Sequence, residues 1–121
     1  MRILTLSIFL CLLSFFGNAQ TTIKLEDVSK HVGDSVNVCG KVFSSRFLES
    51  ATDTPTFINL GAAFPSQLLT IVIWGETRKQ FTGKPENDWM DKEICVTGRI
   101  ALFKGKPQII ITDSKQVKLT P

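Results

Sequence analysis

The sequence has few of the residues that carry catalysis or hold metal ions. It contains one histidine, His31, and three cysteines, with no Cys-x-x-Cys pair among them. A redox pair usually has that spacing, and a zinc site needs more ligands than two cysteines and one histidine. The carboxylates are scattered without a metal-loop spacing, and glycine-rich phosphate loops are absent. We therefore expect no enzyme activity, no cofactor and no metal site.

The sequence also lacks an apolar run as long as a typical membrane span. Residues 3–16 form the longest run, about 14 residues, whereas a spanning helix needs roughly 20. Arg2 precedes this run, and Gly17-Asn18-Ala19 follows it with small residues at the cleavage positions, which is the pattern of a signal peptide. The sequence predicts a signal peptide over 1–19 and one domain over 20–121, in a periplasmic or secreted protein. A retained membrane anchor is the alternative.

There is no strong excess of charge of either sign. The formal net charge is +3, and it falls to about +2 when Arg2 leaves with the signal peptide. A balance this weak does not by itself predict a polyanionic partner. The distribution of the basic residues is more informative than their number.

Removal of residues 1–19 also removes Cys11 and leaves Cys39 and Cys95 as an even pair. Each lies in a segment of alternating apolar and polar residues, 36–42 and 94–100, which predicts a strand with the cysteine on the face opposite the apolar side chains. Opposed residues of an antiparallel pair are close enough for a disulfide bond, and an oxidising compartment favours one. We expect a structural disulfide, with a redox pair or metal ligation as weaker alternatives.

The remaining pattern predicts a mostly-β chain. Leu25, Val28 and Val32 have helical spacing and Gly33 can end a helix, so a short N-terminal helix is expected. Five strands are expected over residues 35–47, 56–60, 68–74, 92–103 and 107–112. One or two helical turns are expected over 76–81, an irregular segment over 82–91, a hairpin turn over 104–106 and a surface tail over 113–121.

This order of elements is typical of the OB-fold, a five-stranded Greek-key barrel. The long first strand and the fourth strand each contain a glycine, Gly40 and Gly98, which in a strand often marks a bulge or a sharp bend. In the OB-fold the first strand pairs with the fourth, which would place Cys39 beside Cys95. An SH3-like barrel or a β-sandwich is the rival fold, although a sandwich usually needs about seven strands.

The candidate binding residues lie on the second and third strands and on the rims beside them, because small OB barrels bind ligands there. The strand faces carry Phe57, Asn59, Thr70 and Trp74. The basic candidates are Lys41, Arg46, Arg78, Lys104 and Lys106. Aromatic rings beside cations suit single-stranded nucleic acid, since bases stack on rings and cations neutralise phosphates. The alternative is that Phe57 and Trp74 belong to the core and the basic turn is ordinary.

Several segments together resemble a known group of proteins. They are Glu26–Gly33, Val38–Val42, Pro55–Gly61, Leu69–Gly75, Ile94–Ile100 and Lys104–Ile109. The chain resembles the small exported bacterial OB-fold domains usually described as nucleic-acid-binding proteins, and the last two segments also resemble the final hairpin of the anticodon-binding OB group. Exported OB-fold stress proteins are a more distant likeness, because they lack this cysteine pair. The resemblance covers nearly all of residues 20–121 and implies a fold more strongly than an activity.

The expected function is binding of single-stranded DNA or RNA without strong sequence preference. The alternative is a non-catalytic envelope-stress or interaction module that binds a protein, a small cation or an oligosaccharide on the same face.

Overall fold

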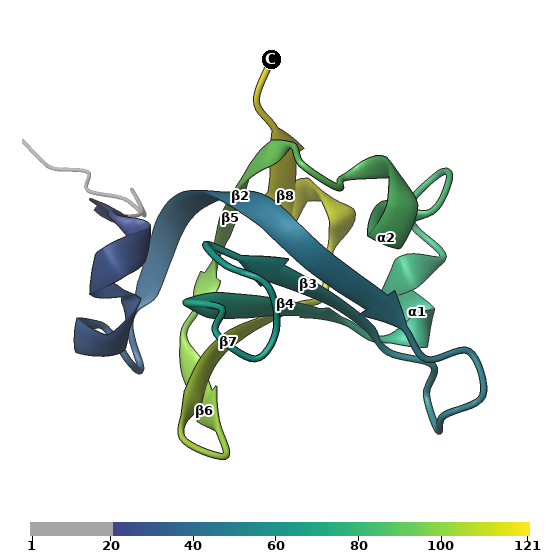
Figure 1. Ribbon diagram of the computed structural model, residues 1–121, viewed down its shortest axis with the longest axis horizontal. Helices are drawn as coiled ribbons and strands as arrows, with labels where there is room; N and C mark the ends of the chain where they lie inside the picture. Colours follow the sequence, from purple (N-terminus) through teal and green to yellow (C-terminus); the bar gives the residue numbers. More distant parts are fainter. Residues whose placement is uncertain (1–20) are drawn as a thin grey trace, which may run out of the picture.

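The computed structural model describes residues 21–121, so the predicted signal peptide lies outside the described residues. This part of the chain is mostly β-structure (Figure 1). Its strands are β1 (Thr21–Ile23), β2 (Ser35–Phe47), β3 (Thr56–Leu60), β4 (Leu69–Ile73), β5 (Glu93–Arg99), β6 (Ala101–Phe103), β7 (Lys106–Ile111) and β8 (Val117–Leu119). Its helices are α1 (Gly75–Arg78), α2 (Pro85–Asp88) and two short 3-10 helices, η1 (Leu25–Lys30) and η2 (Ser114–Gln116). No helix within the described range has the length and apolar character of a membrane span.

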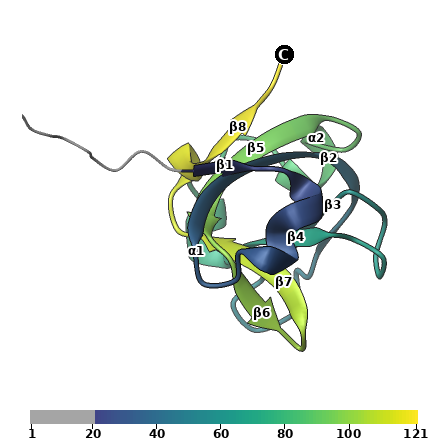
Figure 2. The same cartoon turned by 90° about the vertical axis from the view of Figure 1, so that its left-hand side faces the viewer.

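The eight strands form one sheet that is not closed into a barrel, so the expectation of a five-stranded barrel was wrong. The hydrogen-bonded order is β6-β7-β4-β3-β2-β5-β8, and β1 pairs with β2 outside this path. The long strand β2 joins the two halves of the sheet, because its first part pairs with β5 and its second part with β3. Figure 2 shows the strands curving around a common interior, with η1 across one end.

The predicted fourth strand is divided into β5 and β6 at Ile100. The backbone of Ile100 bonds to the loop before β2 instead of to a neighbouring strand: its carbonyl accepts from the Gly33 amide, and its amide donates to the Asp34 carbonyl. The chain therefore leaves one ladder after Arg99 and enters the other at Ala101, where it pairs with β7. The N-terminal loop thus interrupts the strand.

Two chain ends of the described part add strands that the sequence did not indicate. β1 pairs in parallel with β2, and β8 pairs antiparallel with β5. Residues 113–121 were expected to follow the surface as a tail, and they contain η2 and β8. Residues 82–91 were expected to be irregular, but they contain α2. Both segments are short and polar, so their sequences carry little periodicity. β8 forms because it pairs with β5.

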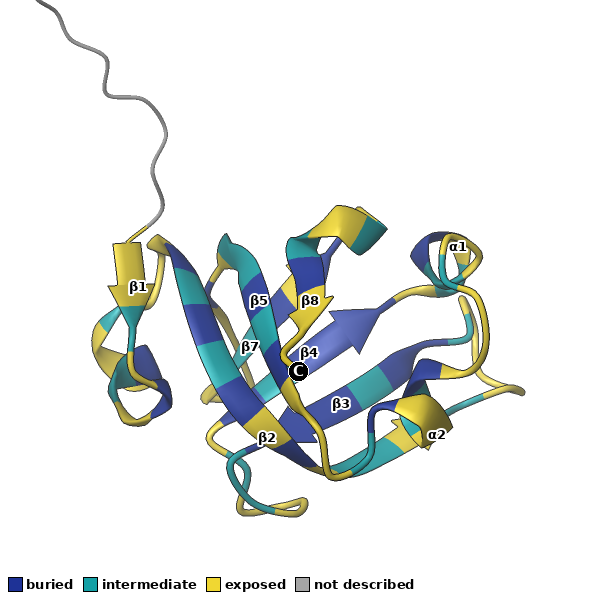
Figure 3. Ribbon diagram, turned by 90° about the horizontal axis from the view of Figure 1, so that it is seen from above, coloured by how far each residue is buried: buried dark blue, intermediate teal, exposed yellow. Residues whose placement is uncertain are grey.

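The core follows the predicted alternation of side chains. Val36, Val38 and Val42 on β2 are buried, as are Ile94 and Val96 on β5, whereas the residues between them are more exposed. Figure 3 shows this alternation as changes between dark blue and paler colours along β2 and β5. The inner faces of β3, β4 and β7 add most of the other isoleucine and leucine side chains of the cluster, and Leu25 of η1 and Ile100 complete it. Removal of these apolar faces from water holds the two halves of the sheet together.

Gly40 and Gly98 do not form the expected bulges. Instead, each allows a side chain from another element to lie close to the strand backbone. Both residues pair regularly across the β2–β5 ladder, and the register shift of β2 lies between Val42 and Ser44. A Cβ atom at Gly40 would lie 2.8 Å from Leu25 Cδ2, and one at Gly98 would lie 2.6 Å from Ile109 Cγ2.

The predicted disulfide between Cys39 and Cys95 is confirmed. The two residues are direct partners in the antiparallel β2–β5 ladder, their Cα atoms are 3.9 Å apart, and 56 positions of sequence separate them. Both cysteines lie on the outer face, opposite the buried valines and isoleucines. The bond therefore links the first long strand to the fifth without occupying the core, and it agrees with an oxidising compartment.

Candidate ligand-binding cleft

A cleft of about 530 Å³ lies on the outer face of β3 and β4, between the second half of β2 and the β6–β7 hairpin. We call it the cleft. Its lining residues are Ser44, Ser45, Arg46, Leu48, Phe57, Asn59, Phe64, Gln67, Thr70, Phe103, Lys104, Lys106, Pro107 and Gln108. They come from five strands (β2, β3, β4, β6 and β7), the residue after β2, the loop 61–68 and the β6–β7 turn, so the cleft exists only when the sheet has formed.

A row of polar side chains crosses the floor of the cleft. Ser44, Asn59, Thr70 and Gln108 are neighbours on β2, β3, β4 and β7, respectively. Asn59 Nδ2 donates to Ser44 Oγ at 3.0 Å, and Thr70 Oγ1 donates to Asn59 Oδ1 at 2.9 Å. Asn59 is only 4% exposed, which is tolerable because both ends of its amide are bonded.

Gln67 extends this row from the loop between β3 and β4. Its Nε2 donates to Thr70 Oγ1 at 3.0 Å, while its Oε1 is buried and has no hydrogen-bond partner within residues 21–121. A buried acceptor without a partner costs about 1–3 kcal/mol. The carbonyl oxygen of Gln67 is therefore a buried acceptor on the cleft floor that still lacks a donor.

The loop 61–68 is attached to both walls of the cleft. On the β2 side, the Phe64 backbone amide donates to Ser44 Oγ at 3.1 Å. On the hairpin side, Lys106 Nζ donates to the Pro65 carbonyl at 2.7 Å. These two bonds fix where the loop passes and thereby hold the Phe64 ring and the Gln67 amide at the cleft.

Three phenylalanine rings and three cations surround the polar floor. Phe57 comes from β3, Phe64 from the loop and Phe103 from the end of β6. Phe64 and Phe103 are 69% and 58% exposed, which is unusual for rings of this size. Arg46, Lys104 and Lys106 supply positive charge, and the lining contains no carboxylate. Lys104 Nζ lies 5.4 Å from the centre of the Phe103 ring, within the range of a cation–π contact.

The structure brings six of the nine predicted binding residues together in the cleft. They are Arg46, Phe57, Asn59, Thr70, Lys104 and Lys106. The prediction missed Phe64, Gln67, Phe103 and Gln108, which also line it. Phe103 stands immediately before the basic turn and Phe64 lies in the loop after the second strand, so their nearness to the predicted rims was the available signal.

The other three predicted residues, Lys41, Trp74 and Arg78, lie outside the cleft. Lys41 is opposite Glu93 on β5 and lines a second hollow of about 450 Å³ near β1. Trp74 follows the far end of β4 and is partly exposed.

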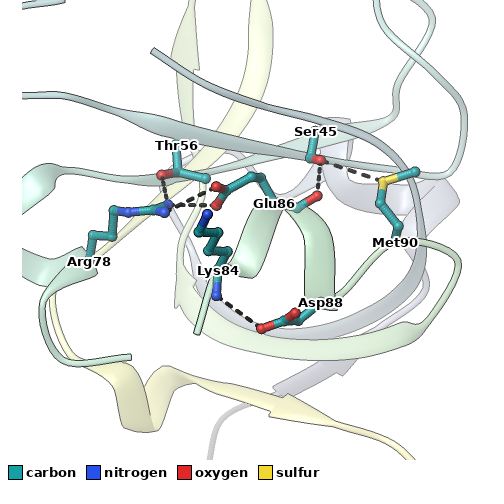
Figure 4. A network of polar contacts seen from close by, with 7 residues as sticks. All are labelled: Ser45, Thr56, Arg78, Lys84, Glu86, Asp88 and Met90. Carbon is teal, nitrogen blue, oxygen red and sulfur yellow. Dashed lines mark hydrogen bonds and ion pairs between the residues drawn. The ribbon is translucent and has the colours of Figure 1, made fainter. Parts of the chain in front are cut away.

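Arg78 belongs to a separate polar network around α2 (Figure 4). Its guanidinium donates to both carboxylate oxygens of Glu86, at 2.6 and 3.1 Å, and to Thr56 Oγ1 at 2.8 Å. It also lies over the Phe47 ring, 3.7 Å from the ring centre. The hydrogen bond from Arg78 is the main cause that lowers the pKa of Glu86. Arg78 therefore has its contacts within the protein, where it joins α1 to α2 and β3.

The α2 network touches the cleft through Ser45, whose hydroxyl donates to the Glu86 carbonyl at 2.5 Å and also contacts Met90 Sδ at 3.5 Å. Ser45 is on β2 and lines the cleft. The position of this wall thus depends on α2.

Within residues 21–121, no group of three or more histidine, cysteine or acidic side chains is placed to hold a metal ion.

No family model matches the sequence, and no curated protein is similar to it. Two solved structures are similar in fold. A protein of Leishmania major Friedlin assigned as an aspartyl-tRNA synthetase superposes with a TM-score of 0.53 and 10% identity, over 89% of this chain and 22% of that one. The structure of yeast Stn1 and Ten1 superposes with a TM-score of 0.60 and 12% identity, over 86% of this chain and 64% of that one.

At this low identity the likeness shows the fold alone, and it identifies the chain as OB-like. The chain spans less than two thirds of the length of each of these two chains.

Proposed function

We propose that the cleft binds single-stranded DNA or RNA without strong sequence preference. The observation that carries this proposal is the composition of the lining: three phenylalanine rings and three cations with no carboxylate. A ring offers every base the same stacking surface, and a cation attracts every phosphate, so neither contact depends on sequence. The cleft volume of about 530 Å³ is within the usual range for ligand sites, about 300–1,000 Å³.

The arrangement of the lining supports a base-in, phosphate-out orientation. Phe64 lines the cleft from the loop 61–68 and Phe103 from the hairpin, and both rings are largely exposed. Arg46 and Lys104 are exposed at the rims. A strand that passes between the rims would place its bases against the rings and its phosphates near the cations. One of the structural neighbours is also named for a tRNA substrate, which agrees with a nucleic-acid ligand.

We propose no catalytic step in the cleft. The lining includes serine and threonine hydroxyls but no histidine, cysteine or carboxylate that could activate them. We also place this binding outside the cytoplasm, in the periplasm or after secretion, because the disulfide requires an oxidising compartment to persist and residues 1–19 have the pattern of a signal peptide.

Fluorescence anisotropy with short labelled oligonucleotides tests this function. The affinity for thymidine and uridine oligomers should be measurable at low salt and should fall steeply between about 50 and about 200 mM salt. Neutral oligosaccharides should not compete. Absence of oligonucleotide binding at low salt would exclude the proposal, and salt-insensitive binding of a neutral oligosaccharide or a protein would favour the interaction-module alternative.

A further inference from the structure

The hydrogen bonds on the cleft floor all run in one direction. Gln67 donates to Thr70, Thr70 donates to Asn59, and Asn59 donates to Ser44. The backbone amide of Phe64, which can only donate, also uses Ser44 Oγ as its acceptor. The carbonyl oxygen of Gln67 stands at the start of this row, and it is the buried side-chain atom of residues 21–121 that lacks a partner.

We propose that this oxygen accepts a hydrogen bond from the edge of a nucleobase, so that Gln67 forms a base-edge subsite in the cleft. The proposal rests on the nucleic-acid function proposed above. It specifies which part of the ligand contacts the cleft floor, namely the edge of a base. A carbonyl oxygen attracts an N–H donor and repels a phosphate oxygen. The floor therefore takes the base edge, while Arg46 and Lys104 at the rims take the phosphates.

The geometry around Gln67 allows this contact. The side chain is half-buried and lines the cleft, and its one hydrogen bond is to Thr70. Its carbonyl oxygen is buried, so the contact requires a rotation of the side chain that exposes this oxygen to the cleft. The loop that carries Gln67 is held at Phe64 and Pro65 by the two walls, so the backbone does not have to move. Phe64 and Phe103 line the same cleft as Gln67, so we place the base that stacks on them within reach of this subsite.

Thymine is the sharpest probe because its pairing edge has a single N–H donor, at N3. We compare a thymidine oligomer with the same oligomer methylated at every N3, using anisotropy at constant low salt. The unchanged protein should bind the methylated oligomer roughly fivefold to tenfold more weakly, the effect of losing one hydrogen bond. This comparison does not depend on the folding of any variant.

Methylation of the oligomer removes a hydrogen-bond donor and also adds bulk. The Gln67→Met variant separates these two effects, because it removes the acceptor on the protein. The variant should bind the unmodified oligomer more weakly and should no longer distinguish the two oligomers. Gln80→Met is the matched control, because Gln80 lies outside the cleft lining, and it should behave as the unchanged protein does. Thermal unfolding of each variant shows that the fold is retained.

Each result has a distinct meaning. Equal binding of both oligomers by the unchanged protein, or continued discrimination by Gln67→Met, would overturn the subsite and leave the proposed function intact. Failure to bind either oligomer would overturn both proposals. Loss of discrimination only in Gln67→Met would support the subsite.

Discussion

Arg78 and Glu86 form a bidentate ion pair between α1 and α2, with nitrogen–oxygen distances of 2.6 and 3.1 Å. Their side chains are 16% and 13% exposed, respectively. A planar guanidinium matches a carboxylate in this way, and partial burial strengthens the pair. α1 and α2 are each four residues long, so they have few hydrogen bonds of their own. The pair is thus a main link that holds both turns against β2 and β3.

Glu86→Gln should lower stability and flatten its dependence on acid. The folded-state pKa of Glu86 is below its ordinary value of 4.5, so its contribution is fully present above about pH 4.5 and is lost as the pH falls through the folded-state pKa. We expect a loss of about 3 kcal/mol near neutral pH and a smaller loss in acid. Urea unfolding at about pH 7 and about pH 3 measures both. An equal effect at the two pH values would contradict the assignment.

Arg78→Gln separates structure from binding. The guanidinium is engaged by Glu86, Thr56 and the Phe47 ring, so the substitution should destabilise the fold by a similar amount. Because Arg78 does not line the cleft, oligonucleotide affinity should stay within about twofold where both proteins are folded. A strong drop in affinity without loss of stability would restore Arg78 as a binding residue.

Reduction of the Cys39–Cys95 bond should destabilise the protein without removing a ligand contact. Closing a loop of 56 positions is worth about 4 kcal/mol in the loop-entropy model, as an upper value. Urea unfolding with and without reductant gives the difference, and intact-mass analysis confirms the bond. The Cys39→Ala/Cys95→Ala double variant should match the reduced protein, and it should then show no response to reductant. Two free thiols in protein from an oxidising compartment would contradict the bond.

Lys104→Ala should weaken binding of all oligonucleotide sequences to a similar degree. Removal of one phosphate contact lowers the slope of log affinity against log salt by about one. Lys115→Ala is the control, because Lys115 is exposed in η2 and does not line the cleft, while it changes the net charge equally. Anisotropy titrations at several salt concentrations give this slope for both variants. Equal slopes would mean that binding depends on the overall charge of the protein and not on a contact made by Lys104.

Phe103→Ala should reduce affinity with little effect on stability. The ring is 58% exposed, so its loss removes little buried area, whereas stacking on one base is worth about 1–3 kcal/mol. Phe43→Ala serves as the comparison, since Phe43 is 42% exposed and lies outside the cleft lining. Anisotropy and thermal unfolding should show a binding loss confined to Phe103→Ala. Equal losses in both variants would argue against stacking in the cleft.

The alternation of apolar residues predicted most of the sheet. Long segments such as 35–47 carry enough period-two pattern to identify both the strand and its buried face. The pairing of Cys39 with Cys95 followed from this alternation and from the expected strand order. The eight-strand count did not follow, because β1, β6 and β8 have three residues each and depend on a neighbouring strand for their hydrogen bonds.

The same limit applies to the binding residues. Alternation places Thr70 and Trp74 on one face of the predicted strand 68–74, but four residues along a strand are about 13 Å, so a shared face does not mean a shared site. Arg78 was a basic residue after a strand by sequence alone, and its partner Glu86 was found only through α2.

By itself, the sequence determined which faces of the long strands are buried and which two cysteines meet, because both depend on a pattern repeated along one strand. Only the tertiary structure decided the cleft. Its polar floor joins residues of four strands and a loop, and its walls are brought together by hydrogen bonds to Ser44 and from Lys106. Contacts between distant segments depend on register, bulges and loop paths, and no local pattern in the chain specifies these.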